Sequence, residues 1–259
     1  MNTLAYKRTG TPSELPLLLL HALPLDSSMW DGVRSYLGDR DILTVDAPGF
    51  GDSIAGEQLG DGTPSLGAYS QAIADTLDEL GIERVALGGL SMGGSVAADF
   101  VARFPARVAG LALMDTNITA DDAKRKEFRE QVAQRAEAGH GYETVKQWTT
   151  TMLAKETPQA VRDDLDARFR ALPNKSLAWI QRAMGAREDR LDAVSLVDGW
   201  VYLIRGSQDA TCSLESLMNI ALRAKKPRIV EIEEAGHFTA DEKPEELAQV
   251  LAEFHDSLS

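Results

Sequence analysis

Short apolar runs, bounded by turn residues and separated by stretches with helical periodicity, constrain the fold more than any other feature of this sequence. Such alternation is typical of βαβ units and of a mainly parallel sheet. Because the runs are apolar almost throughout, we expect strands that are covered on both faces. The predicted strands are residues 17–21, 42–45, 85–90, 108–114, 201–205 and 229–232, and the predicted helices are residues 28–37, 65–80, 91–104, 214–223 and 244–254.

The alternation breaks in the middle of the chain. There the sequence has no strand pattern, carries many charges, and has apolar residues such as Val145, Trp148 and Met152 at helical spacing. Ligands bind beyond the carboxyl ends of parallel strands, so helices inserted after a central strand would cover the site. We therefore predict an α/β core of residues 1–116 and 197–259 and a helical cap of residues 117–196.

Composition limits the partners and the compartment. The chain has 259 residues with 27 basic and 40 acidic side chains, a net charge of −13 that argues against binding to nucleic acid or anionic membranes. Its single cysteine, Cys212, forms no intramolecular disulfide and suits a reducing compartment. The most apolar run, residues 15–25, is too short to span a bilayer. We expect a cytoplasmic protein with no membrane partner, and the oligomeric state stays open.

A G-x-S-x-G motif, residues 89–93, follows one predicted strand and precedes a predicted helix. This strand–turn–helix context is typical of a nucleophile elbow, in which Ser91 sits on a strained turn and the flanking glycines avoid collisions. A phosphate-binding P-loop does not fit, because Gly94 stands where a lysine is required. A tight turn with an incidental serine is the remaining alternative.

A serine hydroxyl needs a general base and an acid that orients the base. Of the four histidines, we favour His237, which follows the last strand and Gly236, over His21, His140 and His255; a surface role is the alternative. For the acid we favour Asp209, which follows the 201–205 strand and gives the order Ser, Asp, His. Asp115 is the rival because it also ends a strand. Asp209 would otherwise be a turn aspartate that bonds its own backbone.

Acyl transfer also needs N–H donors for the developing oxyanion. The first candidate is the Met92 N–H at the start of the helix after Ser91, and the second is the Leu23 N–H, because Pro24 has none. Phe238, next to the candidate base, is the favoured substrate contact. The candidate lining residues in the cap, which at helical spacing are more often packing residues, are Trp148, Met152, Trp179 and Met184.

Together these segments resemble the α/β-hydrolase superfamily, in particular its small serine esterases, lactonases and C–C hydrolases. The motifs that carry the resemblance are H21-A-L-P, D46-A-P-G-F-G-D-S, G89-L-S-M-G-G, G206-S-Q-D and G236-H-F. The resemblance implies the α/β-hydrolase fold, no cofactor, no metal, and a structural role for Asp46. One residue departs from the pattern: Ala22 replaces the usual glycine of the oxyanion loop, and its methyl group would narrow the pocket or shift the loop.

The function that follows is a serine hydrolase that cleaves a small carboxylic ester or lactone through an acyl-enzyme. Family resemblance also admits a C–C bond hydrolase or a perhydrolase with the same three residues. A ligand-binding receptor on a hydrolase scaffold is a different class, and turnover separates it from an enzyme. An aspartate nucleophile is disfavoured, because the elbow residue is serine. In every case the expected partner is a small molecule.

Overall fold

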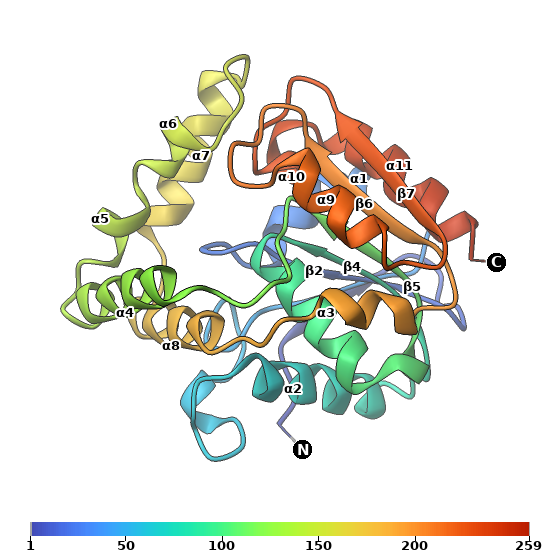
Figure 1. Cartoon of the computed structure of the whole chain (residues 1–259), viewed down its shortest axis with the longest axis horizontal. Helices are drawn as coiled ribbons and strands as arrows, with labels where there is room; N and C mark the ends of the chain where they lie inside the picture. Colours follow the sequence, from blue (N-terminus) through green and yellow to red (C-terminus); the bar gives the residue numbers. More distant parts are fainter. Residues whose placement is uncertain (1, 259) are drawn as a thin grey trace.

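A seven-stranded sheet forms the centre of the computed structural model, which describes residues 2–258 (Figure 1). The strand order is β1-β3-β2-β4-β5-β6-β7, and all neighbours are parallel except β1 and β3. The strands are β1 (Tyr6–Thr9), β2 (Leu17–Leu20), β3 (Ile42–Val45), β4 (Val85–Leu90), β5 (Val108–Met114), β6 (Val201–Gly206) and β7 (Pro227–Ile232).

All six predicted strands are present, with ends that differ by at most two residues, and two findings correct the prediction. β1, with the sequence YKRT, was not predicted, since it has no apolar run; it forms an edge strand, where charged side chains are common. β7 is the opposite edge, and most of its residues are exposed rather than covered on both faces. β2, β4 and β5 are fully buried, as their composition predicts.

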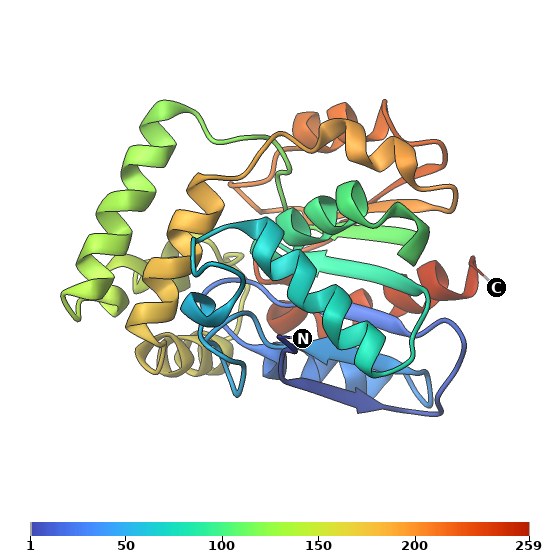
Figure 2. The ribbon, with the colours of Figure 1, turned by 90° about the horizontal axis from the view of Figure 1, so that it is seen from below.

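Helices cover both faces of the sheet (Figure 2). On one face α2 packs on α3, which contacts β4 and the 3-10 helix η4, and on the other face α1 packs on α11. The predicted helix 28–37 divides into η1 and α1. The helices outside residues 117–196 are η1 (Ser27–Trp30), α1 (Asp31–Tyr36), η2 (Gly56–Gln58), α2 (Leu66–Glu79), α3 (Met92–Arg103), η3 (Pro105–Arg107), α9 (Leu214–Ala221), α10 (Thr239–Glu242) and α11 (Pro244–Asp256). η4 (Leu191–Leu196) lies at the end of the segment predicted as the cap and packs on α3 of the core.

Local sequence explains why these elements begin where they do. Ser65 caps α2 by accepting a hydrogen bond from the Ala68 N–H at 3.1 Å, and Asp122 caps α4 by accepting one from the Arg125 N–H at 2.7 Å. The four leucines of β2 are each 0% exposed. Burial of one leucine side chain contributes about 1.5–3 kcal/mol, so this run fixes β2 in the centre of the sheet.

A block of helices lies between β5 and β6 in the sequence and beside the sheet in space (Figures 1 and 2). α4 and α8 form its closest helix pair. Its helices are α4 (Ala123–Glu137), α5 (Gly141–Val145), α6 (Trp148–Thr151), α7 (Gln159–Arg170) and α8 (Asn174–Gly185). Within residues 2–258, no helix has both the length and the hydrophobicity that a bilayer crossing requires.

Candidate active site

Ser91 occupies a sharp turn between β4 and α3. Its φ of 55° lies in the left-handed region that serine rarely adopts, which marks stored backbone strain. The turn is held by the Ser91 N–H, which donates to the Met114 carbonyl at 2.8 Å. A Cβ on Gly89 would lie 2.2 Å from the Gly93 carbonyl oxygen, and a Cβ on Gly93 would lie 2.2 Å from the Leu20 oxygen. Glycine is therefore required on both sides of Ser91, in agreement with the elbow interpretation.

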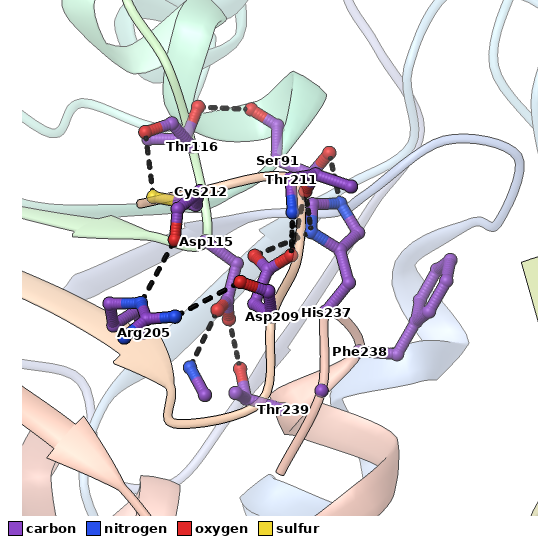
Figure 3. Close-up of polar contacts among 12 residues, drawn as sticks. Ser91, Asp115, Thr116, Arg205, Asp209, Thr211, Cys212, His237, Phe238 and Thr239 are labelled. Atoms are coloured by element: carbon purple, nitrogen blue, oxygen red, sulfur yellow. Dashed lines mark hydrogen bonds and ion pairs between the residues drawn. The ribbon is translucent and has the colours of Figure 1, made fainter. Parts of the chain in front are cut away.

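Three of the predicted residues meet at the carboxyl ends of the parallel strands (Figure 3). The Ser91 hydroxyl lies 2.8 Å from His237 Nε2, and His237 Nδ1 lies 2.9 Å from Asp209 Oδ2. An ionised Asp209 carboxylate can only accept hydrogen bonds. His237 Nδ1 is therefore assigned the proton, and His237 Nε2 accepts the hydrogen bond from the Ser91 O–H. Such an arrangement allows an imidazole to accept the proton of a serine hydroxyl and a carboxylate to stabilise the resulting imidazolium.

Thr211 is a fourth member of this network, and the sequence reasoning missed it. Its hydroxyl donates to Asp209 Oδ1 at 2.8 Å and lies 2.8 Å from His237 Nδ1, and its N–H also donates to Asp209 Oδ1 at 2.7 Å. Burial opposes ionisation of Asp209, but the hydrogen bonds from His237 and Thr211 outweigh it and hold the pKa of this carboxyl below its ordinary value. The available signal was an Asp followed two residues later by Thr, the spacing of an Asx turn.

Asp115, the rival acid, has its hydrogen-bond partners outside this network. Its carboxyl accepts hydrogen bonds from the Gly206 N–H and the Thr239 hydroxyl, both at 2.7 Å. Among the residues described, none of its hydrogen bonds reaches His237. Burial, reinforced by the negative charge of Asp209, raises the pKa of Asp115 well above its ordinary value. The geometry therefore favours Asp209 as the partner of His237.

The loop that carries His237 is bound to the helical block through Glu242. The buried Glu242 carboxylate accepts hydrogen bonds from the Gly236 and Phe238 N–H groups at 3.1 Å, and from the Ala154 N–H at 2.7 Å. It also accepts one from the Thr157 hydroxyl at 2.5 Å, while the His237 N–H itself donates to the Met152 carbonyl at 2.7 Å. One carboxylate thus joins both neighbours of His237 to residues 154–157, a contact that the sequence analysis did not anticipate.

The two candidate oxyanion donors lie on the same cavity as Ser91. Met92 is the first residue of α3, where N–H groups have no intrahelical acceptor. Among residues 2–258, no acceptor is found for the Met92 or the Leu23 N–H. The Ala22 N–H, in contrast, lies 3.1 Å from Met29 Sδ, and the Ala22 side chain is fully buried.

The cavity beside Ser91 has a volume of about 580 Å³, within the usual range for small-molecule sites. Its wall combines residues that follow five strands, β2, β4, β5, β6 and β7, with residues of the helical block. The lining residues are Leu23, Ser91, Met92, Ser95, Asp115, Thr116, Asn117, Asp122, Lys124, Arg125, Phe128, Arg129, Trp148, Met152, Gln181, Met184, Arg187, Thr211 and His237.

Phe238 and Trp179 do not line this cavity, which differs from the substrate contact expected of Phe238 and agrees with the packing role favoured for Trp179. Phe238 is 0% exposed and packs edge-to-face on the His237 ring, with centroids 5.4 Å apart, so it supports the imidazole and has no surface for a substrate. Trp179 packs so closely on Gly56 that a Cβ there would lie 2.3 Å from its ring. Trp148, Met152 and Met184, the other cap residues considered, do line the cavity.

Two further residues singled out from the sequence have structural partners. His21 Nε2 accepts from the Ala47 N–H at 2.8 Å, so its Nδ1–H donates to the Ala22 carbonyl at 3.0 Å, and burial lowers the pKa of this imidazole. The Asp46 carboxylate accepts from the Ser27 and Asp52 N–H groups at 2.8 and 3.2 Å, which joins two turns. His140, in the helical block, and His255, bonded to the Leu15 carbonyl at 2.7 Å, lie outside the cavity lining.

Comparison with known proteins identifies the family of the chain. Residues 17–250 match the alpha/beta hydrolase family. The structure of a thermophilic esterase from Thermogutta terrifontis, solved with malate bound, is 29% identical and superposes with a TM-score of 0.91 over 98% of this chain and 93% of that one. An uncharacterised protein of Mycobacterium tuberculosis is 28% identical, over 93% of this chain and 75% of its own length. A putative 2-succinyl-6-hydroxy-2,4-cyclohexadiene-1-carboxylate synthase of Bacillus subtilis is 23% identical, over 96% of this chain and 93% of its own. The chain therefore belongs to the alpha/beta hydrolase family.

Proposed function

We propose that this protein is a serine hydrolase that cleaves small carboxylic esters or lactones through an acyl-enzyme. The observation that carries the proposal is the continuous hydrogen-bonded chain from the Ser91 hydroxyl through His237 to Asp209, with distances of 2.8 and 2.9 Å. This chain opens on a cavity large enough for a small ester. Similarity to the thermophilic esterase also supports an ester substrate.

In the proposed reaction, His237 Nε2 removes the proton of Ser91 as its Oγ attacks the carbonyl carbon. The Met92 and Leu23 N–H groups stabilise the oxyanion, each contribution being about 3–4 kcal/mol in comparable sites. The imidazolium then protonates the leaving alkoxide, and the acyl group stays on Ser91. Water attacks this ester with His237 again as the base, which releases the acid and restores the serine.

The helices between β5 and β6 serve as a cap in this proposal. Trp148, Met152 and Met184 contribute apolar surface to the cavity, which would help to exclude water from it. The chemistry needs no cofactor or metal, because the nucleophile, the base and the oxyanion donors all come from the chain. The substrate is a small molecule, in keeping with the volume of the cavity.

The test combines covalent labelling with turnover. A fluorophosphonate is expected to label the wild type at one site, and Ser91→Ala abolishes labelling, whereas Ser95→Ala, which removes another serine of the same cavity, retains it. Hydrolysis of p-nitrophenyl acetate and butyrate is expected from the wild type and from Ser95→Ala only. Full activity in Ser91→Ala or His237→Ala would falsify the assignment. Binding of esters without turnover would instead favour the receptor function.

A further inference from the structure

One wall of the cavity is rich in basic side chains. It is formed by α4 and by the segment that follows α8. Lys124, Arg125 and Arg129 come from α4, and Arg187 comes from the segment after α8. These four cations line the same cavity as Ser91, in a chain whose net charge is −13. This wall is therefore positively charged, although the net charge of the whole chain is negative.

Asp121 is the main counter-charge, and it is shared among several cations. Its carboxylate is almost inaccessible, accepts a hydrogen bond from Arg187 at 2.7 Å, and is bonded to Arg129, while Arg125 Nε lies 3.9 Å away. One carboxylate thus faces three guanidinium groups. Asp122 adds a second negative charge, with one of its oxygens committed to capping α4. The cations of this wall consequently exceed its carboxylates by two.

The remaining acid of the cavity lining is Asp115, and burial and the nearby Asp209 raise its pKa, which disfavours a negative charge at this position. The pKa values of the two buried guanidinium groups are lowered, mainly by burial and to a smaller extent by the neighbouring positive charges. Burial, and then the charge of Arg129, lowers the pKa of Arg187 to about 10, and burial lowers the pKa of Arg129. A further anion beside these groups would be stabilised, since it would compensate charges that are partly removed from water.

Two of the four cations have side chains available for such an anion. Among residues 2–258, no hydrogen bond is found from the side chain of Lys124 or of Arg125, and the Arg125 side chain is 66% exposed. Arg129 and Arg187 are in contrast held by Asp121 and by other partners, Gln181 Oε1 at 2.9 Å for Arg129 and the Thr119 carbonyl at 2.7 Å for Arg187. Arg129 and Arg187 are therefore held in place, whereas Lys124 and Arg125 have no side-chain hydrogen bond that a ligand would have to break.

The rest of the cavity lining is mainly apolar and includes Phe128, Trp148, Met152 and Met184. A ligand that reaches from the hydroxyl to the basic wall must therefore have a reactive carbonyl at one end, an apolar middle and a group that guanidinium binds at the other. Guanidinium groups bind carboxylates through charge-assisted hydrogen bonds, and the wall already holds one carboxylate, that of Asp121, with Arg187 at one oxygen and Arg129 at the other.

We propose that the substrate is an ester or lactone that also carries a carboxylate, which binds to Lys124 and Arg125 while its carbonyl lies at Ser91. This inference rests on the proposed hydrolase function, since it uses the same cavity and the same nucleophile. It makes Lys124 and Arg125 specificity-determining residues with no part in the chemical step.

The test compares two substrates that share the reactive ester and differ at the distal carboxyl group, which is charged in mono-p-nitrophenyl glutarate and neutral in its methyl ester. The wild type is expected to show a higher kcat/KM for the glutarate, and Arg125→Gln to lower that value about 10-fold, the loss typical of one charge-assisted hydrogen bond. The same variant leaves the neutral ester nearly unchanged. Arg135→Gln, an exposed position on α4 outside the cavity lining, is the matched control and changes neither value.

Equal kcat/KM values for the two esters in the wild type, or an equal loss for both in Arg125→Gln, would overturn the inference. A binding measurement separates this result from failure of the proposed function. Calorimetric titration of Ser91→Ala with the two esters is expected to give tighter binding of the glutarate, and this preference is lost in Ser91→Ala/Arg125→Gln. Preferential binding without hydrolysis by the wild type would retain the carboxylate site and reject the hydrolase.

Discussion

Replacement of Glu242 by glutamine tests how the His237 loop is held, and the structure gives the expected cost. One oxygen, Oε1, accepts from Gly236 and Phe238, and the other, Oε2, accepts from Gly236, Ala154 and Thr157. An amide has one oxygen, so either orientation leaves at least one buried backbone N–H facing an NH₂ group. An unsatisfied buried donor costs about 1–3 kcal/mol, and the loss of charge from the remaining hydrogen bonds brings the total to about 2–4 kcal/mol.

The assay is urea unfolding of the wild type and Glu242→Gln, followed by circular dichroism. Glu245→Gln, an exposed position on α11, is the matched control and should unfold like the wild type. Because the lost bonds flank His237, kcat for p-nitrophenyl acetate should also fall, by about 10- to 100-fold if the imidazole shifts by about 1 Å. A Glu242→Gln protein with wild-type stability and wild-type kcat would refute the assignment of this carboxylate as the anchor of the loop.

Three further changes address the acid, the pH dependence and the oxyanion loop. Asp209→Asn should lower kcat about 10⁴-fold, as when the aspartate of a serine triad is lost, whereas Asp115→Asn should leave kcat nearly unchanged; the reverse order would identify Asp115 as the acid. Burial raises the pKa of Asp241 in the folded protein to about 6, despite its ion pair with Arg168, and this value lies above that of the unfolded chain. The stability that the protonated carboxyl contributes is therefore fully present below pH about 4 and is lost as the pH rises through about 6. Asp241→Asn should therefore exceed the wild type by up to about 3 kcal/mol in urea unfolding at pH 8 and match it at pH 4, and equal stability at both would contradict the shift. Ala22→Gly should keep or raise kcat/KM for p-nitrophenyl acetate, and a collapse would mean that the cavity is shaped around the methyl group.

Much of the core could be predicted because local sequence patterns indicate parallel strands and the helices that connect them. A buried strand needs apolar residues throughout, so β4 and β5 were evident from composition alone. Strands that run parallel end at one edge, which is why Ser91, Asp209 and His237 were expected together although they are far apart in the sequence. β1 gives no such signal, because its outer position leaves polar side chains in contact with water.

Side-chain direction is what local patterns do not determine. Phe238 is adjacent to His237, yet its ring turns into the core and supports the imidazole from behind instead of facing the cavity. Thr211 was recognisable in principle, because an Asx turn is a local feature. Glu242 was not, since its partners Ala154 and Thr157 are 88 and 85 positions away.

The position of Glu242 links the predicted cap to the proposed chemistry. The cap helices contribute Trp148 and Met152 to the cavity, and the same segment donates to the carboxylate that holds both neighbours of His237. A displacement of residues 152–157 would therefore change the cavity wall and the support of the imidazole together. Gly236 makes this contact possible, because a Cβ there would lie 2.3 Å from the Met152 carbonyl oxygen. Gly236→Ala should consequently reduce turnover of charged and neutral esters equally, unlike a change at the basic wall, which should separate them.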